Sequence, residues 1–355
     1  MMPNQKTSAP ASEQHGEFKK LSLKKLQDQV VVITGASSGI GLSTARMAAA
    51  KGAKLVLAAR NAAALKQLTE ELRNQGHSAV WIKADVGNEE DINRIAEAAL
   101  SEYGRFDTWI NNAGVSIFGK AMDVTIEDMK RDFDTNFWSV VYGSRAAVNH
   151  FKERGVPGAL INVGTVYGDR GVVLQSTYSA SKFAVHGWTE NLRMELEKEK
   201  APVSVTLVRP GRIDTPYNEH ARSYLDKQPA HIGMMYAPEA VADAILFAAE
   251  HPKRDMFVGF QAKFGAFVGN VAPRFMDKFM ELTMFRTQQA DRPSRSVTDN
   301  ALYEPGYGMH ERGTNKGVVR KKSLYLMAEK HPVLASMAIA GISSALWNSI
   351  FKKRC

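Results

Sequence analysis

A β-branched run that ends in three closely spaced glycines constrains this chain more than any other stretch. Residues 30–33 are all valine or isoleucine, Thr34 follows, and Gly35, Gly39 and Gly41 come before an alanine-rich helical pattern. Strand, tight turn and helix in this order are typical of the phosphate-binding half of a nucleotide-binding βαβ unit. The glycines allow a pyrophosphate to approach closely, and the N–H groups at the helix start face its charge. The spacing is GxxxGxG rather than the GxGxxG dinucleotide fingerprint, so the turn alone is a weak signal.

Apolar strands and helical segments alternate after this turn as far as Phe260. This pattern predicts an α/β fold with a doubly wound, parallel seven-stranded sheet of the Rossmann-like type, whose ligand crevice lies at the carboxyl ends of the strands. After the first strand we expect strands at 54–60, 79–85, 107–114, 158–164, 203–211 and 256–260. We expect helices at 62–75 and 89–103, a long helix capped by Thr125, and a helix at about 176–199. The segment 212–237 lacks strong periodicity and is predicted to be a mobile substrate-covering loop with a short helix.

Composition and charge bound the classes of function. With 355 residues, of which 44% are hydrophobic and 23% charged, the chain can bury a large core. Its one cysteine, Cys355, excludes an intrachain disulfide and a cysteine-based metal site, and fits the cytosol or a cytosol-facing membrane surface. His150, His186 and His251 lack metal-ligand spacing, so no metal site is predicted. The net charge of +9 arises in residues 251–355, which hold 17 Lys+Arg and 8 Asp+Glu.

This basic end of the chain suggests an anionic partner such as lipid head groups, or else a solvated surface without a partner. Nucleic acid is not expected, because basic clusters such as 320–322 lack interleaved aromatic residues and a fold that reads bases.

Three regions follow from the changes in composition. Residues 1–20 are polar and are predicted to be a disordered arm, and residues 21–262 are predicted to form a dinucleotide-binding and catalytic domain. Residues 263–355 form a helical C-terminal extension with an amphipathic helix at 265–285, a polar linker at 288–322 and an uncharged apolar helix at 332–351. Twenty helical residues match the thickness of a bilayer, so this last helix is either a membrane anchor or interfacial helix, or a helix packed on the domain or its dimer partner.

The pair Tyr178 and Lys182 carries the chemistry. One helical turn separates them, so both side chains point from one face of a helix into the same space. A free tyrosine has a pKa of about 10, which is too high for ready proton exchange near neutrality. An adjacent ammonium favours the phenolate, so we expect Lys182 to lower the pKa of Tyr178 and make it a usable acid/base group.

Five motifs in this order resemble those of the short-chain dehydrogenase/reductase family. They are TGASSGIG at 34–41, NNAG at 111–114, Asn136, Thr165, and YSASK at 178–182, and the resemblance covers residues 27–260. It implies hydride transfer between a nicotinamide and a carbonyl or secondary alcohol, with Tyr178 exchanging the proton on oxygen. Lys182 is then expected to hydrogen-bond the nicotinamide ribose, and Asn136 to hold a water that relays protons to it.

Thr165 departs from the family pattern, in which a serine usually occupies the position thirteen residues before the tyrosine. Threonine keeps the hydroxyl that polarises a carbonyl oxygen, but its methyl group restricts χ1. Two functions therefore stay open: an active oxidoreductase, or a nucleotide-binding, membrane-associated interaction protein with weak or lost catalysis.

Arg60 indicates which cofactor is used. An acidic residue about 20 positions after the glycine turn would bond the adenosine ribose and repel a 2′-phosphate. Ala59 stands there instead and Arg60 comes next, while Ser37 in the turn can donate a further hydrogen bond. NADP(H) is therefore favoured over NAD(H).

The remaining cofactor contacts are expected from the turn and from the resemblance. The predicted cofactor-binding set, besides Tyr178 and Lys182, is Gly35, Ser37, Ser38, Gly39, Ile40, Arg60, Asp85, Val86, Asn112, Ala113, Gly114, Pro210, Gly211, Ile213 and Thr215. The resemblance also implies a homo-oligomer. The substrate is expected to be a small carbonyl or alcohol compound, and the apolar tail makes a lipophilic one plausible by association.

Overall fold

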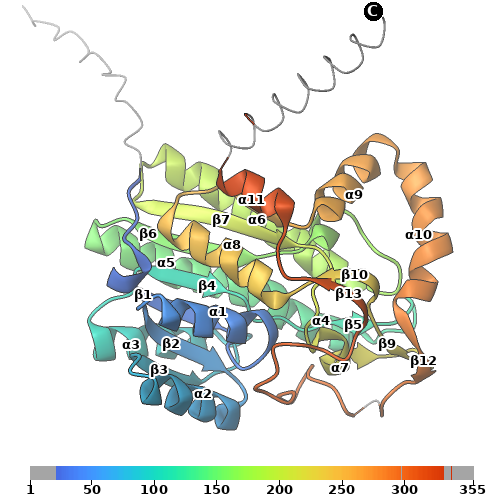
Figure 1. Cartoon of the computed structure of the whole chain (residues 1–355), viewed down its shortest axis with the longest axis horizontal. Helices are drawn as coiled ribbons and strands as arrows, with labels where there is room; N and C mark the ends of the chain where they lie inside the picture. The colour runs from blue at the N-terminus through green and yellow to red at the C-terminus, as the bar shows by residue number, and fades with distance from the viewer. Residues whose placement is uncertain (1–20, 297, 332–336, 338–355) are drawn as a thin grey trace, which may run out of the picture.

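A seven-stranded parallel sheet organises the computed structural model, which describes residues 21–296, 298–331 and 337 (Figure 1). The strands lie in the order β11-β7-β6-β4-β1-β2-β3. Their bounds are β1 (Val30–Thr34), β2 (Lys54–Ala59), β3 (Ala79–Lys83), β4 (Thr108–Asn111), β6 (Gly158–Val163), β7 (Val203–Pro210) and β11 (Asp255–Val258). The predicted α/β fold class and doubly wound sheet are confirmed.

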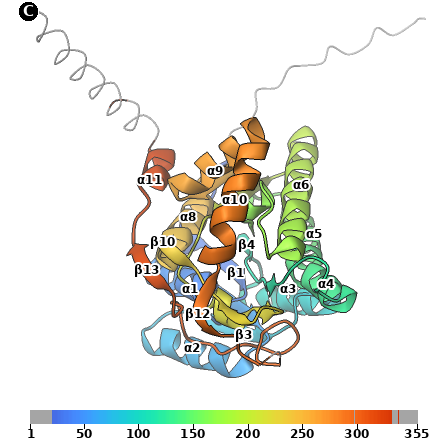
Figure 2. The ribbon, with the colours of Figure 1, turned by 90° about the vertical axis from the view of Figure 1, so that its right-hand side faces the viewer.

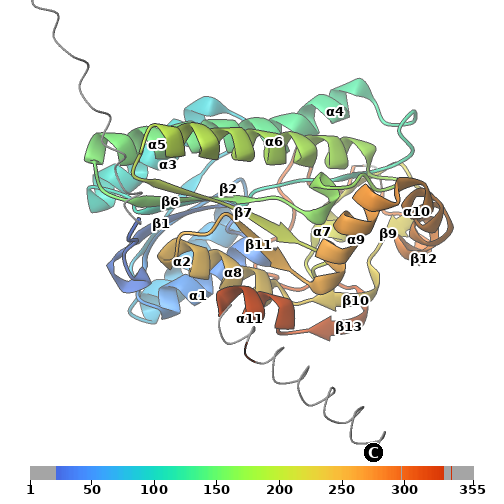
Figure 3. The same ribbon diagram turned by 90° about the horizontal axis from the view of Figure 1, so that it is seen from above.

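Helices cover both faces of the sheet (Figure 3). One face carries α1 (Gly39–Ala50), α2 (Ala62–Asn74), α8 (Pro238–Glu250) and α11 (Leu324–Lys330). The other carries α3 (Glu89–Tyr103), α4 (Ile126–Phe133), a π-helical turn η2 (Asp134–Trp138), α5 (Ser139–Arg154) and α6 (Ser176–Lys198). Alternate residues of β1 enter different cores, Val31 and Ile33 on the α1 side and Val30 and Val32 on the α3 side. This is why the strand has an unbroken apolar sequence.

The glycine turn permits the close contact between β1 and α1. Gly35 has φ +69°, a conformation that L side chains rarely adopt. A Cβ on Gly41 would lie 2.1 Å from the Gly35 carbonyl oxygen, so only glycine fits there. The start of α1 can therefore pack directly under the turn, with its N–H groups facing the space above the sheet.

The segment 212–237 contains more regular structure than the predicted loop with one short helix. It holds α7 (Tyr217–His220), β8 (Arg222–Ser223), β9 (Lys227–Pro229) and β10 (Ile232–Tyr236). The first of these short strands pairs with β5 (Ile117–Phe118), and the other two pair with strands of the C-terminal extension.

The C-terminal extension differs from its expected layout. The single amphipathic helix predicted at 265–285 is two helices, α9 (Phe260–Val271) and α10 (Pro273–Thr287), because Pro273 starts a new helix. They stand beyond the carboxyl ends of the strands and expose several large apolar side chains, among them Phe267 and Phe275 (Figure 2).

Residues 288–322, expected as a linker, include two strands that pair with the catalytic domain. They are β12 (Gln289–Pro293), antiparallel to β9, and β13 (Lys316–Arg320), parallel to β10. Periodicity could not reveal them, because each is short, polar and held by a distant partner. Among the described residues no helix is both long and apolar enough to cross a bilayer. The predicted arm at 1–20 and, apart from residue 337, the predicted apolar helix at 332–351 lie outside the described residues.

Asp107, which immediately precedes β4, joins β1, α5 and two loop segments at the amino end of the sheet, opposite the glycine turn. Its buried carboxylate accepts hydrogen bonds from Lys24 Nζ at 2.7 Å, the Val30 N–H at 2.9 Å, Arg154 Nη2 at 2.9 Å and Arg105 Nε at 3.1 Å. Burial alone would raise the Asp107 pKa, but the bonds from Lys24, Val30 and Arg154 outweigh it and hold the pKa below its usual value.

We predict that Asp107→Asn destabilises the protein by about 3 kcal/mol, because it leaves partly buried cations without their counter-charge. Since the Asp107 pKa is lower in the folded state, its stabilisation is present above the unfolded-state pKa of about 3.9. It is lost as pH falls through the folded-state pKa. Urea unfolding at pH 7 and at about pH 3, below the unfolded-state pKa, should therefore show a variant deficit that shrinks on acidification. The exposed Asp123→Asn serves as the control, and an equal stability of the two variants at pH 7 would contradict the prediction.

Candidate active site

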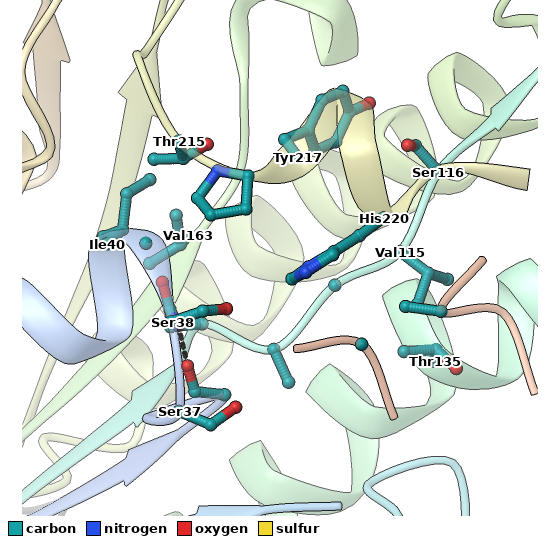
Figure 4. A pocket seen from close by; sticks show the side chains of 18 of the residues that line it. Ser37, Ser38, Ile40, Val115, Ser116, Thr135, Val163, Thr215, Tyr217 and His220 are labelled. Carbon is teal, nitrogen blue, oxygen red and sulfur yellow. Dashed lines mark hydrogen bonds between the residues drawn. The ribbon is translucent and has the colours of Figure 1, made fainter. Parts of the chain in front are cut away.

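One cavity at the carboxyl ends of the strands collects the predicted site residues (Figure 4). All the predicted cofactor-binding residues line it, and so does Thr165. They come from the ends of β1, β2, β3, β4, β6 and β7 and from the starts of α1 and α6. Asn136 is the exception, because it is fully buried behind the cavity wall.

The NNAG segment is fixed to the glycine turn by hydrogen bonds. Asn112 Nδ2 donates to the Thr34 carbonyl oxygen at 2.9 Å. Thr34 Oγ1 accepts from the N–H groups of Asn112 at 3.0 Å and Ala113 at 3.1 Å. These bonds align the ends of β1 and β4, so the floor of the cavity is preorganised.

Tyr178 and Lys182 meet at the inner end of the cavity. The Lys182 ammonium lies 5.9 Å from the centroid of the Tyr178 ring and donates to the Val163 carbonyl oxygen at 3.2 Å. The Tyr178 ring lies edge-on to the Tyr217 ring, with centroids 5.4 Å apart, and Thr165 lines the same cavity. The threonine that replaces the usual serine is therefore in the cavity that holds the phenol.

Burial dominates the titration of this pair. It raises the pKa of Tyr178, and the nearby Asp132 raises it further, while the hydrogen bonds from Tyr217 and Thr165 lower it. The prediction that the Tyr178 pKa is lowered is therefore wrong for the protein groups present, because burial raises it. Burial also lowers the pKa of Lys182 to about 8, against the opposing effect of Asp132. Burial disfavours the charged form of both side chains, so the pKa of Tyr178 rises and the pKa of Lys182 falls. The sequence motif alone does not reveal these shifts.

Asp132 is a buried carboxyl group that the sequence analysis did not select. Burial raises its pKa to about 7, although Lys182, Ser181 and Asn136 favour the ionised form. Asn136 Nδ2 donates to Asp132 and to the Val115 carbonyl oxygen, and Asn136 Oδ1 accepts from the Val115 N–H at 2.9 Å. Asp132 precedes Asn136 by four residues, which places both on one face of a helix. This spacing is the sequence signal that could have identified Asp132 as a site residue.

Two guanidinium groups meet one backbone oxygen beside the cavity. Arg60 Nη1 donates to the Leu302 carbonyl oxygen at 3.1 Å, and Arg131 Nε donates to the same oxygen at 3.1 Å. Arg131 also pairs with Asp85, which lines the cavity, at 2.5 Å. Arg60 itself lines the cavity, and its role in cofactor binding stays a prediction.

Several lining residues were not anticipated from the sequence. Tyr217 and His220 come from α7, and residues 301 and 305–307 come from the C-terminal extension. The Pro and Gly residues around Gly306 indicate a loop but not where that loop docks. Among the described residues, no group of three or more His, Cys, Asp or Glu could hold a metal ion.

Comparison with known proteins shows the family to which this chain is similar. The family model described as short chain dehydrogenase matches residues 29–226. A Bacillus subtilis (strain 168) protein named uncharacterized oxidoreductase YxnA is 66% identical over 337 residues, which are 95% of this chain and 94% of that protein. Dehydrogenase/reductase SDR family member 11 of Homo sapiens is 32% identical over 241 residues, 65% of this chain and 92% of that protein.

A solved structure shows the same fold. The crystal structure of a short chain dehydrogenase/reductase from Burkholderia phymatum in complex with NAD has a TM-score of 0.61 and 24% identity. The match covers 77% of this chain and 100% of that one. The glycine turn, the NNAG segment and the Tyr178–Lys182 pair thus stand in a cavity on a sheet of this type, within a matching sequence. The chain belongs to the short-chain dehydrogenase/reductase family and is an oxidoreductase.

Proposed function

We propose that the protein is an NADP(H)-dependent oxidoreductase that interconverts a carbonyl and a secondary alcohol, with Tyr178 as the acid/base group. The observation that carries the proposal is that Tyr178, Lys182 and Thr165 line one cavity together with the glycine turn. The two hydroxyls of Tyr178 and Thr165 can then both bind one substrate oxygen. This favours an active enzyme over a protein that only binds nucleotide.

The hydrogen-bond donors that line the cavity are suited to bind a dinucleotide. Ser37, Ser38 and Ile40 line it at the start of α1, where backbone N–H groups favour a pyrophosphate. Arg60 lies at one end and Lys182 at the other. When bound, the cofactor supplies or accepts the hydride at the substrate carbon.

The protein's own groups handle the proton. In the reductive direction the hydride reaches the carbonyl carbon, and the Tyr178 hydroxyl gives its proton to the carbonyl oxygen, leaving a phenolate. Thr165 donates a hydrogen bond to the same oxygen as its negative charge develops. Lys182, with its pKa lowered to about 8, holds its proton only weakly at neutral pH and is suited to return one to Tyr178. The oxidative direction reverses each step.

NADP(H) is the proposed cofactor because a phosphate would meet positive charge at the adenosine end. Ala59 ends β2 without a carboxylate, Arg60 follows it, and the partner of Asp85 is Arg131. Arg60 can therefore bind a 2′-phosphate without a free carboxylate opposing it.

We predict that Tyr178→Phe lowers kcat by at least about 10²-fold while NADPH binding is retained, because only the proton donor is lost. Turnover can be followed as NADPH oxidation over a panel of ketones and aldehydes. Tyr142→Phe, which alters a tyrosine stacked on Trp138 outside the cavity, should keep wild-type turnover. Undiminished turnover of Tyr178→Phe would remove Tyr178 from the mechanism.

We predict that Asp132→Asn moves the alkaline limb of the kcat profile to lower pH. The Asp132 carboxylate raises the pKa of Lys182, so without it burial lowers that pKa further below about 8 and the ammonium is lost sooner as pH rises. The kcat values between pH 6 and pH 10 measure the shift. Glu127→Gln, on the exposed side of the same helix, is the matched control. A merely structural role would lower kcat equally at every pH and would leave the limb in place.

We predict that Arg60→Ala weakens NADPH binding by about 10-fold or more and NADH binding much less, because one charge-assisted phosphate contact is lost. Fluorescence titration of both cofactors gives the two dissociation constants. Arg94→Ala, at an exposed arginine of α3, should change neither. An equal loss for both cofactors would contradict a 2′-phosphate contact.

A further inference from the structure

Residues 301–315, here called the strap, lie in the segment between β12 and β13 (Figure 1). Residues 301 and 305–307 of the strap line the cavity. The family match ends at residue 226, so the strap lies outside it. The Bacillus relative, by contrast, matches 95% of this chain. The strap is thus an addition to the family domain, and its contacts fall on the residues proposed to bind the cofactor.

The strap is hydrogen-bonded to the phosphate-binding turn. The Gly39 N–H donates to the His310 carbonyl oxygen at 2.9 Å, and the Met309 N–H donates to the Ser37 carbonyl oxygen at 2.8 Å. Asn61, which also lines the cavity, donates through Nδ2 to the Gly306 carbonyl oxygen at 2.9 Å.

Carbonyl groups of the strap accept hydrogen bonds from Arg60, at the end of the cavity where we propose that adenosine binds. Arg60 donates to the carbonyl oxygens of Ala301 at 2.5 Å, Leu302 at 3.1 Å and Tyr303 at 2.9 Å. The Leu302 side chain is fully buried in a small apolar cluster with Val115. One end of the strap is therefore anchored both by charge and by apolar packing.

Ion pairs and hydrogen bonds anchor the other end. Glu311 accepts from Ser43 Oγ at 2.6 Å and from Arg46 Nη1 at 2.6 Å. Arg312 Nη2 donates to Glu239 at 2.7 Å. Between the two anchors, Tyr307 lies edge-on to His220 with ring centroids 4.5 Å apart, and both rings line the cavity.

Glycine at position 308 allows the strap to lie close to the domain. A Cβ built on Gly308 would lie 2.2 Å from the Ala64 Cβ at the start of α2 and 3.2 Å from the Ser37 carbonyl oxygen. No such approach is possible for two side chains, so the fit depends on the absence of a methyl group at this position.

We propose that the strap is the outer wall of the dinucleotide site, with residues 305–307 contacting the adenosine half of the bound cofactor. This inference rests on the proposed cofactor function. A dinucleotide enclosed between residues 305–307 and the floor of the cavity leaves only when the strap lifts, which requires breaking the bonds to Ser37, Gly39 and Asn61. Strap opening therefore limits cofactor release, and bound cofactor holds the strap closed.

The test uses Gly308→Ala in the full chain, because the added methyl collides with Ala64 and moves the strap without removing any core side chain. NADPH release, measured by stopped-flow fluorescence on displacement, should become about 10-fold faster or more. The double variant Gly308→Ala/Ala64→Gly removes the collision and should return the rate to within about 3-fold of wild type. Gly265→Ala, an identical change in open space on α9, should leave the rate unchanged.

Trypsin cleavage after Arg312 gives a second measurement on the wild-type protein, and it does not depend on whether the variant folds. Saturating NADPH should slow this cleavage several-fold. An unchanged release rate in a folded Gly308→Ala protein, or cleavage indifferent to NADPH, would overturn the strap inference and leave the proposed function standing. Failure of the wild-type protein to bind NADPH or NADH at all would overturn both.

Discussion

The enclosure of Lys182 away from water is the constraint on which the catalytic end of the site depends. Burial lowers the pKa of Lys182 to about 8 and raises that of Asp132 to about 7, and each opposes the shift of the other. Neither group is fixed in one ionisation state at neutral pH, and this suits both to proton exchange. Tyr178 needs such a partner, because burial raises its own pKa and a phenol in that environment gives up its proton only when charge is supplied nearby.

The parallel sheet brings these groups together at one edge. It also keeps them apart from the charged groups that stabilise the fold. Every strand of the sheet runs in one direction, so the carboxyl ends collect the glycine turn, the NNAG segment and the approach to Tyr178 on one edge. The amino ends meet near Asp107, whose hydrogen bond with the Val30 N–H and whose ion pairs link the start of β4 to β1, α5 and the start of the domain. Charge that stabilises the fold thus lies at the edge opposite to charge that serves the proposed reaction.

The fold could be predicted from the sequence because its strands are buried on both faces and are therefore unbroken apolar runs, as in β1. The cavity residues followed from the strand ends and from the motifs. What could not be predicted depends on long-range contacts. A motif does not reveal how deeply Tyr178 is buried, so the predicted direction of its pKa shift was wrong. Asp132 resembles any acid of an amphipathic helix until its burial is known. The short strand β13 has no periodicity and exists only because β10 lies beside it.

The strap shows why an added segment can join a site without leaving a mark in the sequence. It binds mainly through backbone carbonyl and N–H groups, which every residue carries, and through Gly308, which contributes only the lack of a side chain. Its connection to the proposed cofactor choice is physical. Arg60, which we propose to bind a 2′-phosphate, also donates to three strap carbonyl oxygens. Arg131 donates to the same Leu302 oxygen as Arg60, so two cations lie against this end of the strap. In this proposal, cofactor selection and cofactor enclosure therefore depend on the same end of the strap.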